Sequence, residues 1–555
     1  MKKIKSRINW ITWGTLLILV VYAFYAGIFI YQSSFVYEGE RIFVLFDDAT
    51  ISMQYARNLA NGAGPVWNAG GERVEGFTNP LWVAFMALFH LLPVAYSKMA
   101  LFIQISGAIF MMLSLVYVKK ITELITGNNA WATLLAVFTT AFYYPLSNWS
   151  LFGTEVGVLI FLTVLGAWWA IRDVSKGQFK PGVYILMGIS TLVRIDMAVP
   201  YIILWAFLFW FDKANRRKHL LWGALGLVIF LGGQTLLRLW YYGDPLPNTY
   251  YLKMTGMDTF LRIKRGLYVF AKFAWNLGPV FVALPFLVFA FKRNRYTLLA
   301  ILLFLGQCAY SVYVGGDAWE HRGGSNRFIT LGMPFFMILF SMTSVYLFSL
   351  LKDHGLKEFA GKARSWVTPV VNLCLAGFVF LSLVNFNTLL DGNSLKYWLL
   401  LQPTVFSPGS QRYAVDGLLV KSLTMPEAKI LVGAAGNVAY FSERFSYDMM
   451  GKADYEIARQ TAKIPDNLDS LTFLQPGHTK YDYSISIGRY QPDVLVELMR
   501  YTDEEFLPYL DNYEKVMVNK HAMYFRKDSP NVRWDVLEAY RTAPAETTAP
   551  LDVTP

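Results

Sequence analysis

Long apolar runs separated by short polar segments dominate the first 390 or so residues of the chain. A helix needs about 20 apolar residues to cross the hydrocarbon core of a membrane. By this rule we expect spans at residues 9–31, 98–118, 130–147, 154–171, 182–194, 197–212, 219–241, 267–291, 297–314, 328–350 and 366–388. The pattern therefore predicts a polytopic α-helical membrane protein with about 11 transmembrane helices.

The apolar stretch 79–95 is predicted not to cross the membrane. An Asn-Pro pair opens it and Pro93 closes it, so we expect a helix lying in the outer interface. If this stretch crossed, every later basic loop would face outward, against the tendency of Lys and Arg to stay in the cytoplasm.

Beyond residue 390 the long apolar runs give way to a mixed, soluble pattern. The run Ala-Lys-Ile-Leu-Val, followed by a Gly-rich turn at 433–436 and an acidic segment, is typical of an α/β domain. We therefore expect a membrane domain at residues 1–390 and a soluble α/β domain at 391–540. The Pro- and Thr-rich segment 541–555 is predicted to be a disordered tail.

Composition supports a membrane protein and excludes a nucleic-acid partner. The 555 residues are 55% hydrophobic, with a mean hydropathy of +0.35. The net charge of +11 comes from Lys and Arg gathered in short loops between apolar runs, the pattern of topology signals. The two cysteines lie inside apolar runs, so neither a disulfide nor a cysteine metal site is predicted.

The distribution of basic loops predicts the orientation. The basic N-terminus should be cytoplasmic, with the first span a retained anchor and not a cleaved signal peptide. The unusual polar clusters and the C-terminal domain then face outward, which in a bacterium is the outer side of the inner membrane. The chain has no P-loop or dinucleotide-binding fingerprint. A lipid-borne substrate is therefore the natural alternative to a cytoplasmic nucleotide.

Two adjacent carboxylates, Asp47 and Asp48, follow the first span. Like charges at this range raise one pKa, which makes the pair a candidate base or cation ligand. The alternative is an acidic helix N-terminus without chemistry. A divalent cation on the pair is compatible with the sequence but is not required, because arginines can take its place.

Further candidate residues lie in the other predicted outer clusters. A carboxylate ends one loop, an Arg and an Asp lie within membrane reach, and a Pro-rich loop ends in a lysine suited to phosphate. A Gly-rich loop carries arginines that can clamp a phosphate bidentately. A plain hairpin or a solvated loop is the alternative for the last two clusters. The candidate residues are Glu155, Arg194, Asp196, Asn248, Tyr251, Lys253, Asp317, His321, Arg322, Arg327 and His478.

The motifs resemble the GT-C superfamily of polyprenyl-phosphate-sugar glycosyltransferases over nearly the whole chain. The acidic pair in a first outer loop, followed by interfacial helices and many spans, is the general sign. The segments D-D-A-T-I-S-M-Q-Y-A-R-N-L-A-N-G, E-R-V-E-G-F-T-N-P-L-W, P-N-T-Y-Y-L-K, G-N-V-A-Y-F-S, Y-D-M-M-G and P-G-H-T-K resemble the mycobacterial terminal β-(1→2)-arabinofuranosyltransferase family, AftB, and its bacterial relatives.

This resemblance implies an activity and a set of partners. The family transfers a furanosyl unit from decaprenyl phosphate to an envelope or cell-wall glycan. Its first-loop Asp corresponds to Asp47, its G-G-D Asp to Asp317, and its Pro-Asn-Thr loop to Asn248 and Lys253. The implied partners are a polyprenyl-phosphate-linked sugar, an envelope glycan acceptor and membrane lipid.

Our hypothesis is that Asp47 is the general base in a single displacement with inversion. Arg194, Lys253, Arg322 and Arg327 would hold the donor phosphate, and Glu155, Asp196, Asn248, Tyr251, Asp317, His321 and His478 would bind substrate. A mannosyl- or aminoarabinosyl-type transferase of the same superfamily is the nearest alternative. A lipid-linked-sugar transporter or flippase is an alternative from a different class. It would show polar residues in several spans and internal repeats. Apart from Arg194 and Asp196 the spans of this sequence are apolar, and no repeat period recurs.

Overall fold

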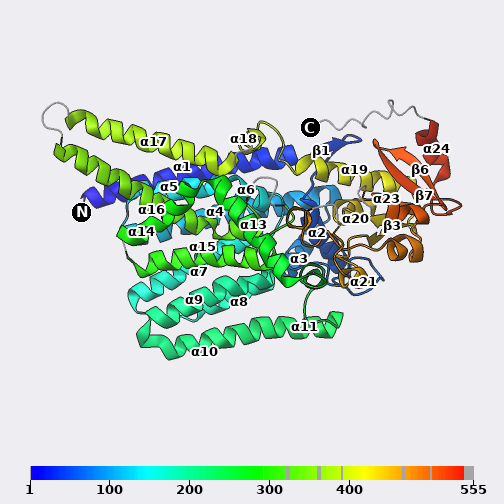
Figure 1. Cartoon of the computed structure of the whole chain (residues 1–555), viewed down its shortest axis with the longest axis horizontal. Helices are drawn as coiled ribbons and strands as arrows, with labels where there is room; N and C mark the ends of the chain where they lie inside the picture. The colour runs from blue at the N-terminus through cyan, green and yellow to red at the C-terminus, as the bar shows by residue number, and fades with distance from the viewer. Residues whose placement is uncertain are drawn as a thin grey trace.

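The protein has two parts arranged along one long axis, a bundle of long helices and a smaller α/β domain at one end (Figure 1). The computed structural model describes residues 2–291, 293–319, 325–358, 364–388, 392–464, 469–499 and 503–542. The N-terminus lies at the end of the bundle remote from the α/β domain.

Every predicted span coincides with a helix or a helix pair. Within the described residues, seven helical segments are long and apolar enough to cross a membrane, at 10–33, 96–126, 156–176, 213–242, 295–314, 327–353 and 368–388. These segments belong to α1 (Lys2–Ser33), α4 (Tyr96–Thr126), α7 (Val156–Lys176), α10 (Arg216–Leu227) with α11 (Gly233–Tyr242), α15 (Arg295–Val314), α16 (Arg327–Glu358) and α17 (Arg364–Thr388). The protein is therefore a multi-pass membrane protein, as predicted.

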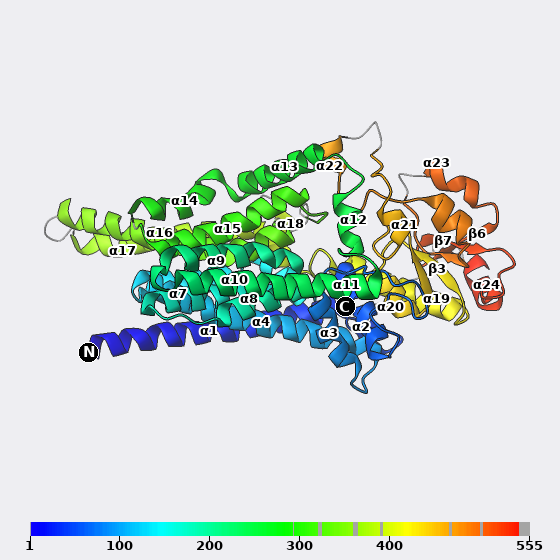
Figure 2. The same ribbon diagram turned by 90° about the horizontal axis from the view of Figure 1, so that it is seen from below.

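The remaining predicted spans are shorter or broken. Three coincide with the shorter apolar helices α5 (Ala130–Ala141), α8 (Gly182–Val193) and α9 (Ala198–Phe211). The span predicted at 267–291 is not one straight helix, because α13 (Thr259–Leu277) and α14 (Pro279–Phe291) meet at 91° (Figure 2). Gly278 adopts a φ of 92° at the break, and the proline after it cannot donate a helical hydrogen bond.

The segment that follows α1 forms a compact layer at the α/β end of the bundle. The hairpin of β1 (Phe35–Tyr37) and β2 (Glu40–Ile42) leads to α2 (Asp47–Ala60), which begins with the acidic pair. The stretch predicted to lie in the interface forms α3 (Pro80–His90), which ends before Pro93. Two short helices, α6 (Tyr144–Leu151) and α12 (Asn248–Met254), complete this layer.

The C-terminal domain is built on a five-stranded mixed sheet of order β4-β3-β5-β7-β6. The strands are β3 (Lys429–Val432), β4 (Phe445–Asp448), β5 (Val494–Leu495), β6 (Tyr513–Val518) and β7 (His521–Arg526). β3 pairs in parallel with β4 and β5, whereas β7 pairs antiparallel with β5 and β6. The helices are α18 (Gly392–Trp398), α19 (Ser407–Leu423), α20 (Asn437–Ser442), α21 (Tyr455–Ala458), α22 (Ser470–Phe473), α23 (Asp503–Phe506) and α24 (Trp534–Thr542). The predicted α/β character is confirmed. Residues 543–555 of the predicted tail lie outside the described residues.

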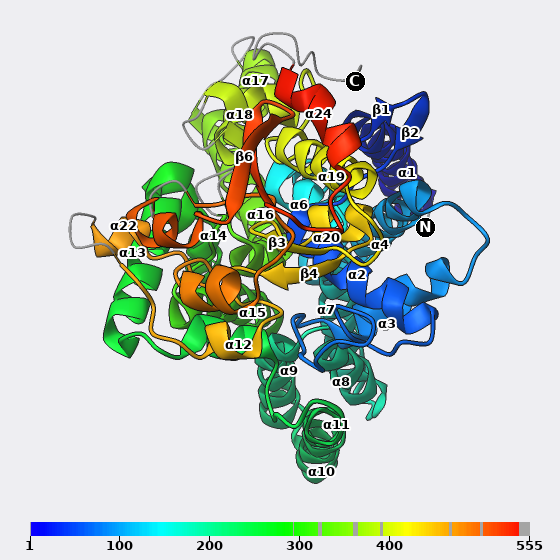
Figure 3. The same cartoon turned by 90° about the vertical axis from the view of Figure 1, so that its right-hand side faces the viewer.

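The two parts are joined by hydrogen bonds around α2, which lies beside α20 when the molecule is viewed from the α/β end (Figure 3). Arg57 of α2 donates to the carbonyl of Tyr440 at 2.7 Å. The Asn68 side chain both donates to the Ser446 carbonyl at 2.8 Å and accepts from its amide at 3.0 Å, as a neighbouring strand would. This seam brings the acidic pair against the C-terminal domain.

Candidate active site

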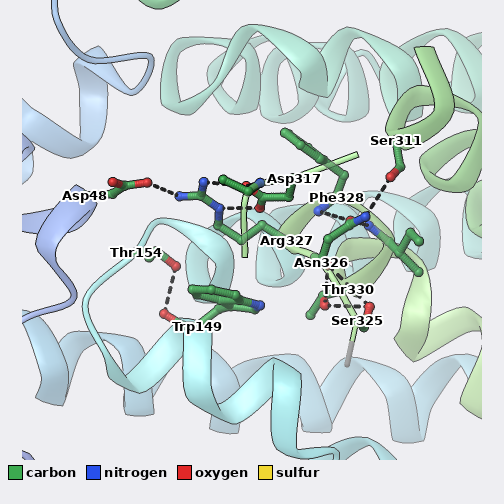
Figure 4. Close-up of polar contacts among 12 residues, drawn as sticks. Asp48, Trp149, Thr154, Ser311, Asp317, Ser325, Asn326, Arg327, Phe328 and Thr330 are labelled. Carbon is green, nitrogen blue, oxygen red and sulfur yellow. Dashed lines mark hydrogen bonds and ion pairs between the residues drawn. The ribbon is translucent and has the colours of Figure 1, made fainter. Parts of the chain in front are cut away.

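Arg327, the first residue of α16, joins two of the predicted carboxylates (Figure 4). Its Nε and Nη2 donate to the two Asp317 oxygens at 2.7 and 2.9 Å, and its Nη1 donates to Asp48 Oδ2 at 3.1 Å. The side chain of Asn326 accepts from two backbone amides of the first turn of α16, which fixes the start of the helix. Three of the predicted site residues, Asp48, Asp317 and Arg327, therefore lie in contact with one another.

The second partner of Asp48 comes from the C-terminal domain. Lys452 Nζ lies 3.1 Å from Asp48 Oδ1, and both side chains are largely buried. Burial alone would raise the pKa of Asp48, but Lys452 and Arg327 outweigh it and hold this pKa well below its usual range. Asp48 is therefore ionised at any physiological pH.

Asp47 has a different environment from its neighbour. Its Oδ1 accepts from the backbone amide of Asn437 at 2.7 Å, and its Oδ2 accepts a longer bond from the amide of Gly436 at 3.2 Å. Burial raises the pKa of Asp47 to about 6, against the opposing effects of Lys452 and of the Asn437 amide. Asp48 contributes a smaller upward effect, so the predicted raised pKa comes mainly from desolvation and less from the adjacent charge.

A cavity of about 320 Å³ lies beside this charge cluster. Its polar floor contains Asp317, Arg327 and Lys253, and its wall is largely apolar and aromatic. The apolar and aromatic lining residues include Val199, Leu246, Tyr250, Met254, Tyr310, Tyr313, Val314 and Phe328. Such a cavity suits a ligand with a charged head and an apolar body.

Lys253 is the free cation of this floor. Its side chain makes no hydrogen bond or ion pair to any other described residue, although Asp317 and Asp48 lie within electrostatic reach. Burial and the neighbouring Arg327 lower the pKa of Lys253. An unpaired lysine in a cavity wall is suited to bind an anion, which agrees with its predicted role at a phosphate.

Arg194 and its neighbours line another part of the cavity as a closed network. Arg194 donates to both Asp196 oxygens at 2.6 and 2.8 Å and to Glu155 at 2.8 Å. Glu155 also accepts from Asn79, which accepts from Ser52 of α2. Because three donor nitrogens of Arg194 are already paired, these contacts favour a positioning role over the phosphate contact that we predicted.

Asn248 and Tyr251 of α12 contact the C-terminal domain. The Asn248 amide donates to the carbonyls of Gly451, Lys452 and Asp454 at 2.9 to 3.1 Å. The Tyr251 ring lies 4.0 Å from the Arg459 guanidinium. For Asn248, which is buried, the contacts favour positioning of the C-terminal domain over the predicted substrate contact.

His478 lies near the cluster on the C-terminal side. Its ring packs edge-on against Trp319, with ring centroids 5.5 Å apart. Burial and the charge of Lys452 lower its pKa to about 3, so the imidazole is neutral. The predicted site residues His321 and Arg322 lie outside the described residues.

We looked for clusters of side chains that could bind a metal ion in the described parts of the chain. They contain no group of three or more His, Cys, Asp or Glu residues arranged to hold a metal ion.

The sequence missed two contributors to the site. Lys452 lies 404 residues from Asp48 along the chain, and no motif links them. The sequence marked the Gly-rich turn at 433–436 only as part of an α/β pattern, yet its last glycine and Asn437 donate to Asp47. An added Cβ on Gly436 would lie 1.9 Å from the Asp47 carbonyl oxygen, so the close approach requires glycine.

Comparisons with known proteins agree with the predicted fold. A domain of unknown function (DUF8728) matches residues 409–540, and no curated protein sequence matches the chain. The oligosaccharyltransferase AglB of Archaeoglobus fulgidus, solved with an inhibitory peptide and a dolichol-phosphate, is 10% identical with a TM-score of 0.54, and covers 94% of this chain and 74% of its own. The same organism's oligosaccharyltransferase with Zn and sulfate is 11% identical with a TM-score of 0.51, covering 93% and 73%.

ArnT of Cupriavidus metallidurans in the apo state is 12% identical with a TM-score of 0.49, covering 92% of this chain and 98% of its own. The likeness to AglB shows that this chain has a GT-C-type fold with an added α/β domain, which confirms the predicted fold class.

Proposed function

We propose that this protein is a membrane glycosyltransferase that moves a sugar, arabinofuranose, from a polyprenyl-phosphate donor to an envelope glycan on the outer face of the inner membrane. The observation that carries the proposal is the cavity whose apolar wall meets the charged floor of Lys253, Arg327 and Asp317. A polyprenyl phosphate likewise combines an apolar chain with a charged phosphate group. The GT-C fold supports the proposal, since AglB has been solved with a dolichol-phosphate.

The donor phosphate would bind at Lys253, and Arg327, whose three nitrogens are already paired with Asp48 and Asp317, would contribute only its nearby charge. Lys253 has no competing protein partner among the described residues, and Arg327 is held in place by Asp317. Fixed positive groups at the leaving phosphate stabilise the charge that develops as the sugar departs. Arg194 supports this wall of the cavity through its contacts with Glu155 and Asp196.

Asp47 is the proposed general base. A pKa of about 6 leaves it mostly ionised at neutral pH but basic enough to accept a proton, whereas Asp48 is held as a weaker base. The acceptor hydroxyl oxygen forms a bond to the anomeric carbon as the bond from that carbon to the phosphate oxygen breaks. The phosphate leaves with the electron pair, and the hydroxyl proton passes to Asp47.

The C-terminal domain is the proposed acceptor-binding part. Its turn at Gly436 contacts Asp47 directly, so a glycan held on this domain would reach the base across the seam. A mannosyl or aminoarabinosyl donor fits the same site chemistry, and the sugar is therefore the first quantity to measure.

The test is a transfer assay with the purified full-length protein and a panel of polyprenyl-phosphate sugars. We expect transfer from the arabinofuranosyl donor, no transfer by Asp47→Asn, and retained binding of polyprenyl phosphate by that variant. Transfer from another sugar of the panel would correct the donor. Absence of transfer from every donor, or full turnover by Asp47→Asn, would overturn the proposed function or the assigned base respectively.

A further inference from the structure

We infer that Lys452 of the C-terminal domain is a positioning residue of the active site, which fixes Asp48 and brings a buried positive charge to the acidic pair Asp47 and Asp48. The inference rests on the proposed function and extends it. The C-terminal domain then completes the catalytic centre in addition to its proposed part in acceptor binding.

The backbone around Lys452 is held from two sides. Within its own domain, the Asp448 side chain accepts from the amides of Met450 at 2.9 Å and Ala453 at 2.8 Å. From the membrane domain, Asn248 donates to the Lys452 carbonyl at 3.1 Å and to the carbonyls of Gly451 and Asp454. A solvent-exposed lysine would not need so many hydrogen bonds around its backbone. We infer that these bonds fix the position of the Lys452 ammonium group.

The ammonium group points at the acidic pair. Lys452 Nζ lies 3.1 Å from Asp48 Oδ1, and its side chain is only 10% exposed. Asp48, Asp47 and Asp448 are its carboxylate neighbours, and together they raise the pKa of Lys452 against the effect of burial. Lys452 therefore stays charged and lies in the field of both members of the pair.

Other titratable groups also lie near Asp47 and Asp48. Comparison with them shows how much Lys452 itself affects the protonation of Asp47. Arg327 at the start of α16 pairs with Asp48, Lys253 of α12 lies within electrostatic reach of Asp48, and His478 nearby is neutral. Arg327 does not figure among the main influences on Asp47, whereas Lys452 is the largest one that opposes burial. Removal of Lys452 should therefore change the protonation of Asp47 more than any other single loss of charge in the cluster.

The experiment compares pH–rate profiles of the full-length protein with Lys452→Met, Lys452→Arg and a matched control. Lys480→Met is the control because Lys480 belongs to the same domain and donates to the Tyr251 carbonyl across the seam at 3.0 Å, yet pairs with no carboxylate among the described residues. We expect the acid limb of the wild-type profile near pH 6 to move up by about one unit or more in Lys452→Met.

The two remaining variants define the outcome. In Lys452→Arg the acid limb of the pH–rate profile should return to within about 0.3 pH units of the wild-type position. In Lys480→Met the acid limb should stay at the wild-type pH even if the maximum rate of this variant falls. A reduced rate with an unmoved acid limb in Lys452→Met would overturn the inference and leave Lys452 as a domain contact. If the wild type transfers no sugar from any polyprenyl-phosphate donor, the proposed function itself has failed.

Discussion

At the scale of single residues, Asp47 carries a charge that the fold disfavours. Its pKa is about 6 in the folded protein and about 3.9 in an unfolded chain, so the native state binds the proton more tightly. The free energy of unfolding therefore falls as pH rises from about 4 to 6. At neutral pH it is about 3 kcal/mol lower than it would be if the pKa of Asp47 were the same in both states. A buried carboxylate kept at such a cost is typical of a functional group.

Replacing that charge should stabilise the protein while it removes activity. We expect Asp47→Asn to raise the thermal midpoint of the detergent-solubilised protein at pH 8, with a difference that shrinks toward zero near pH 4. Asp48→Asn is the matched control, and it should lower the midpoint because it leaves Lys452 and Arg327 without their shared partner. An Asp47→Asn variant that is less stable at pH 8 would contradict this account of the burial cost.

Lys253 provides a separate test at the phosphate. A charge-assisted hydrogen bond contributes about 1.5–3 kcal/mol, so Lys253→Met should weaken donor binding by about 10- to 100-fold. Lys253→Arg should recover part of the affinity. The measurement is titration with polyprenyl phosphate, and the acid limb of the pH–rate profile should change little, unlike in Lys452→Met. Unchanged affinity in Lys253→Met would remove this lysine from the phosphate site.

The sequence found the residues that a motif or a local pattern marks. Asp48, Asp317 and Arg327 do meet, and Lys253 lines the cavity beside them. The sequence did not predict Lys452, because its partner lies 404 residues away and a single lysine in a turn carries no signal. The sequence also did not predict that Arg194 pairs with Asp196 and Glu155. A sequence shows which charged residues exist, but not which of them are already paired in the fold.

At the scale of elements, hydropathy located the helices but not their continuity. The break between α13 and α14 falls inside an apolar run that counts as one span by length, and only its Gly-Pro pair marks the bend. The shorter helices α8 and α9 were placed correctly because Arg194 and Asp196 interrupt the apolar run between them. Polar interruptions are therefore better guides to element ends than hydropathy alone.

The turn before α20 can be tested as an element. Gly436→Ala places a Cβ against the Asp47 carbonyl. Because the obstructing atom belongs to the backbone of α2 and cannot move away as a side chain could, we expect the C-terminal domain to dock poorly against the membrane domain. The variant should lose most transfer activity, and the C-terminal domain should become more sensitive to limited proteolysis. Gly433→Ala in the same turn is the matched control, since the one tight contact of its Cβ would be the flexible end of Met449 at 3.2 Å, with Glu497 at ordinary contact distance. Equal behaviour of the two variants would show that close approach at Gly436 is not needed.

At the scale of the whole molecule, the site exists only where the two parts meet. The membrane part supplies Asp47, Asp48, Arg327 and Lys253, and the C-terminal part supplies Lys452. Helix α2, which begins with the acidic pair, lies at the end of the bundle that carries the α/β domain, whereas the basic turn between α9 and α10 lies toward the other end (Figure 1). The orientation of the protein in the membrane therefore decides which substrates the site can reach.

That orientation can be measured by cysteine labelling in intact cells. The basic turn should be cytoplasmic, because Lys and Arg near the ends of spans resist translocation. We expect Glu456→Cys, on the exposed α21, to react with a membrane-impermeant maleimide in intact cells. Arg217→Cys, exposed at the start of α10, should react only after permeabilisation. Both variants carry Cys374→Ser, since Cys374 is exposed in α17 and Cys308 is buried.

The reverse labelling pattern would place the acidic pair in the cytoplasm. A cytoplasmic site would have direct access to nucleotide-activated sugars, and the argument for a lipid-borne donor would then rest on the cavity alone. The predicted pattern instead leaves the site without access to cytoplasmic nucleotides, so that a donor carried across the membrane on a lipid becomes a requirement of the topology as well as of the site chemistry. The labelling result thus tests the premise on which the choice of donor class depends.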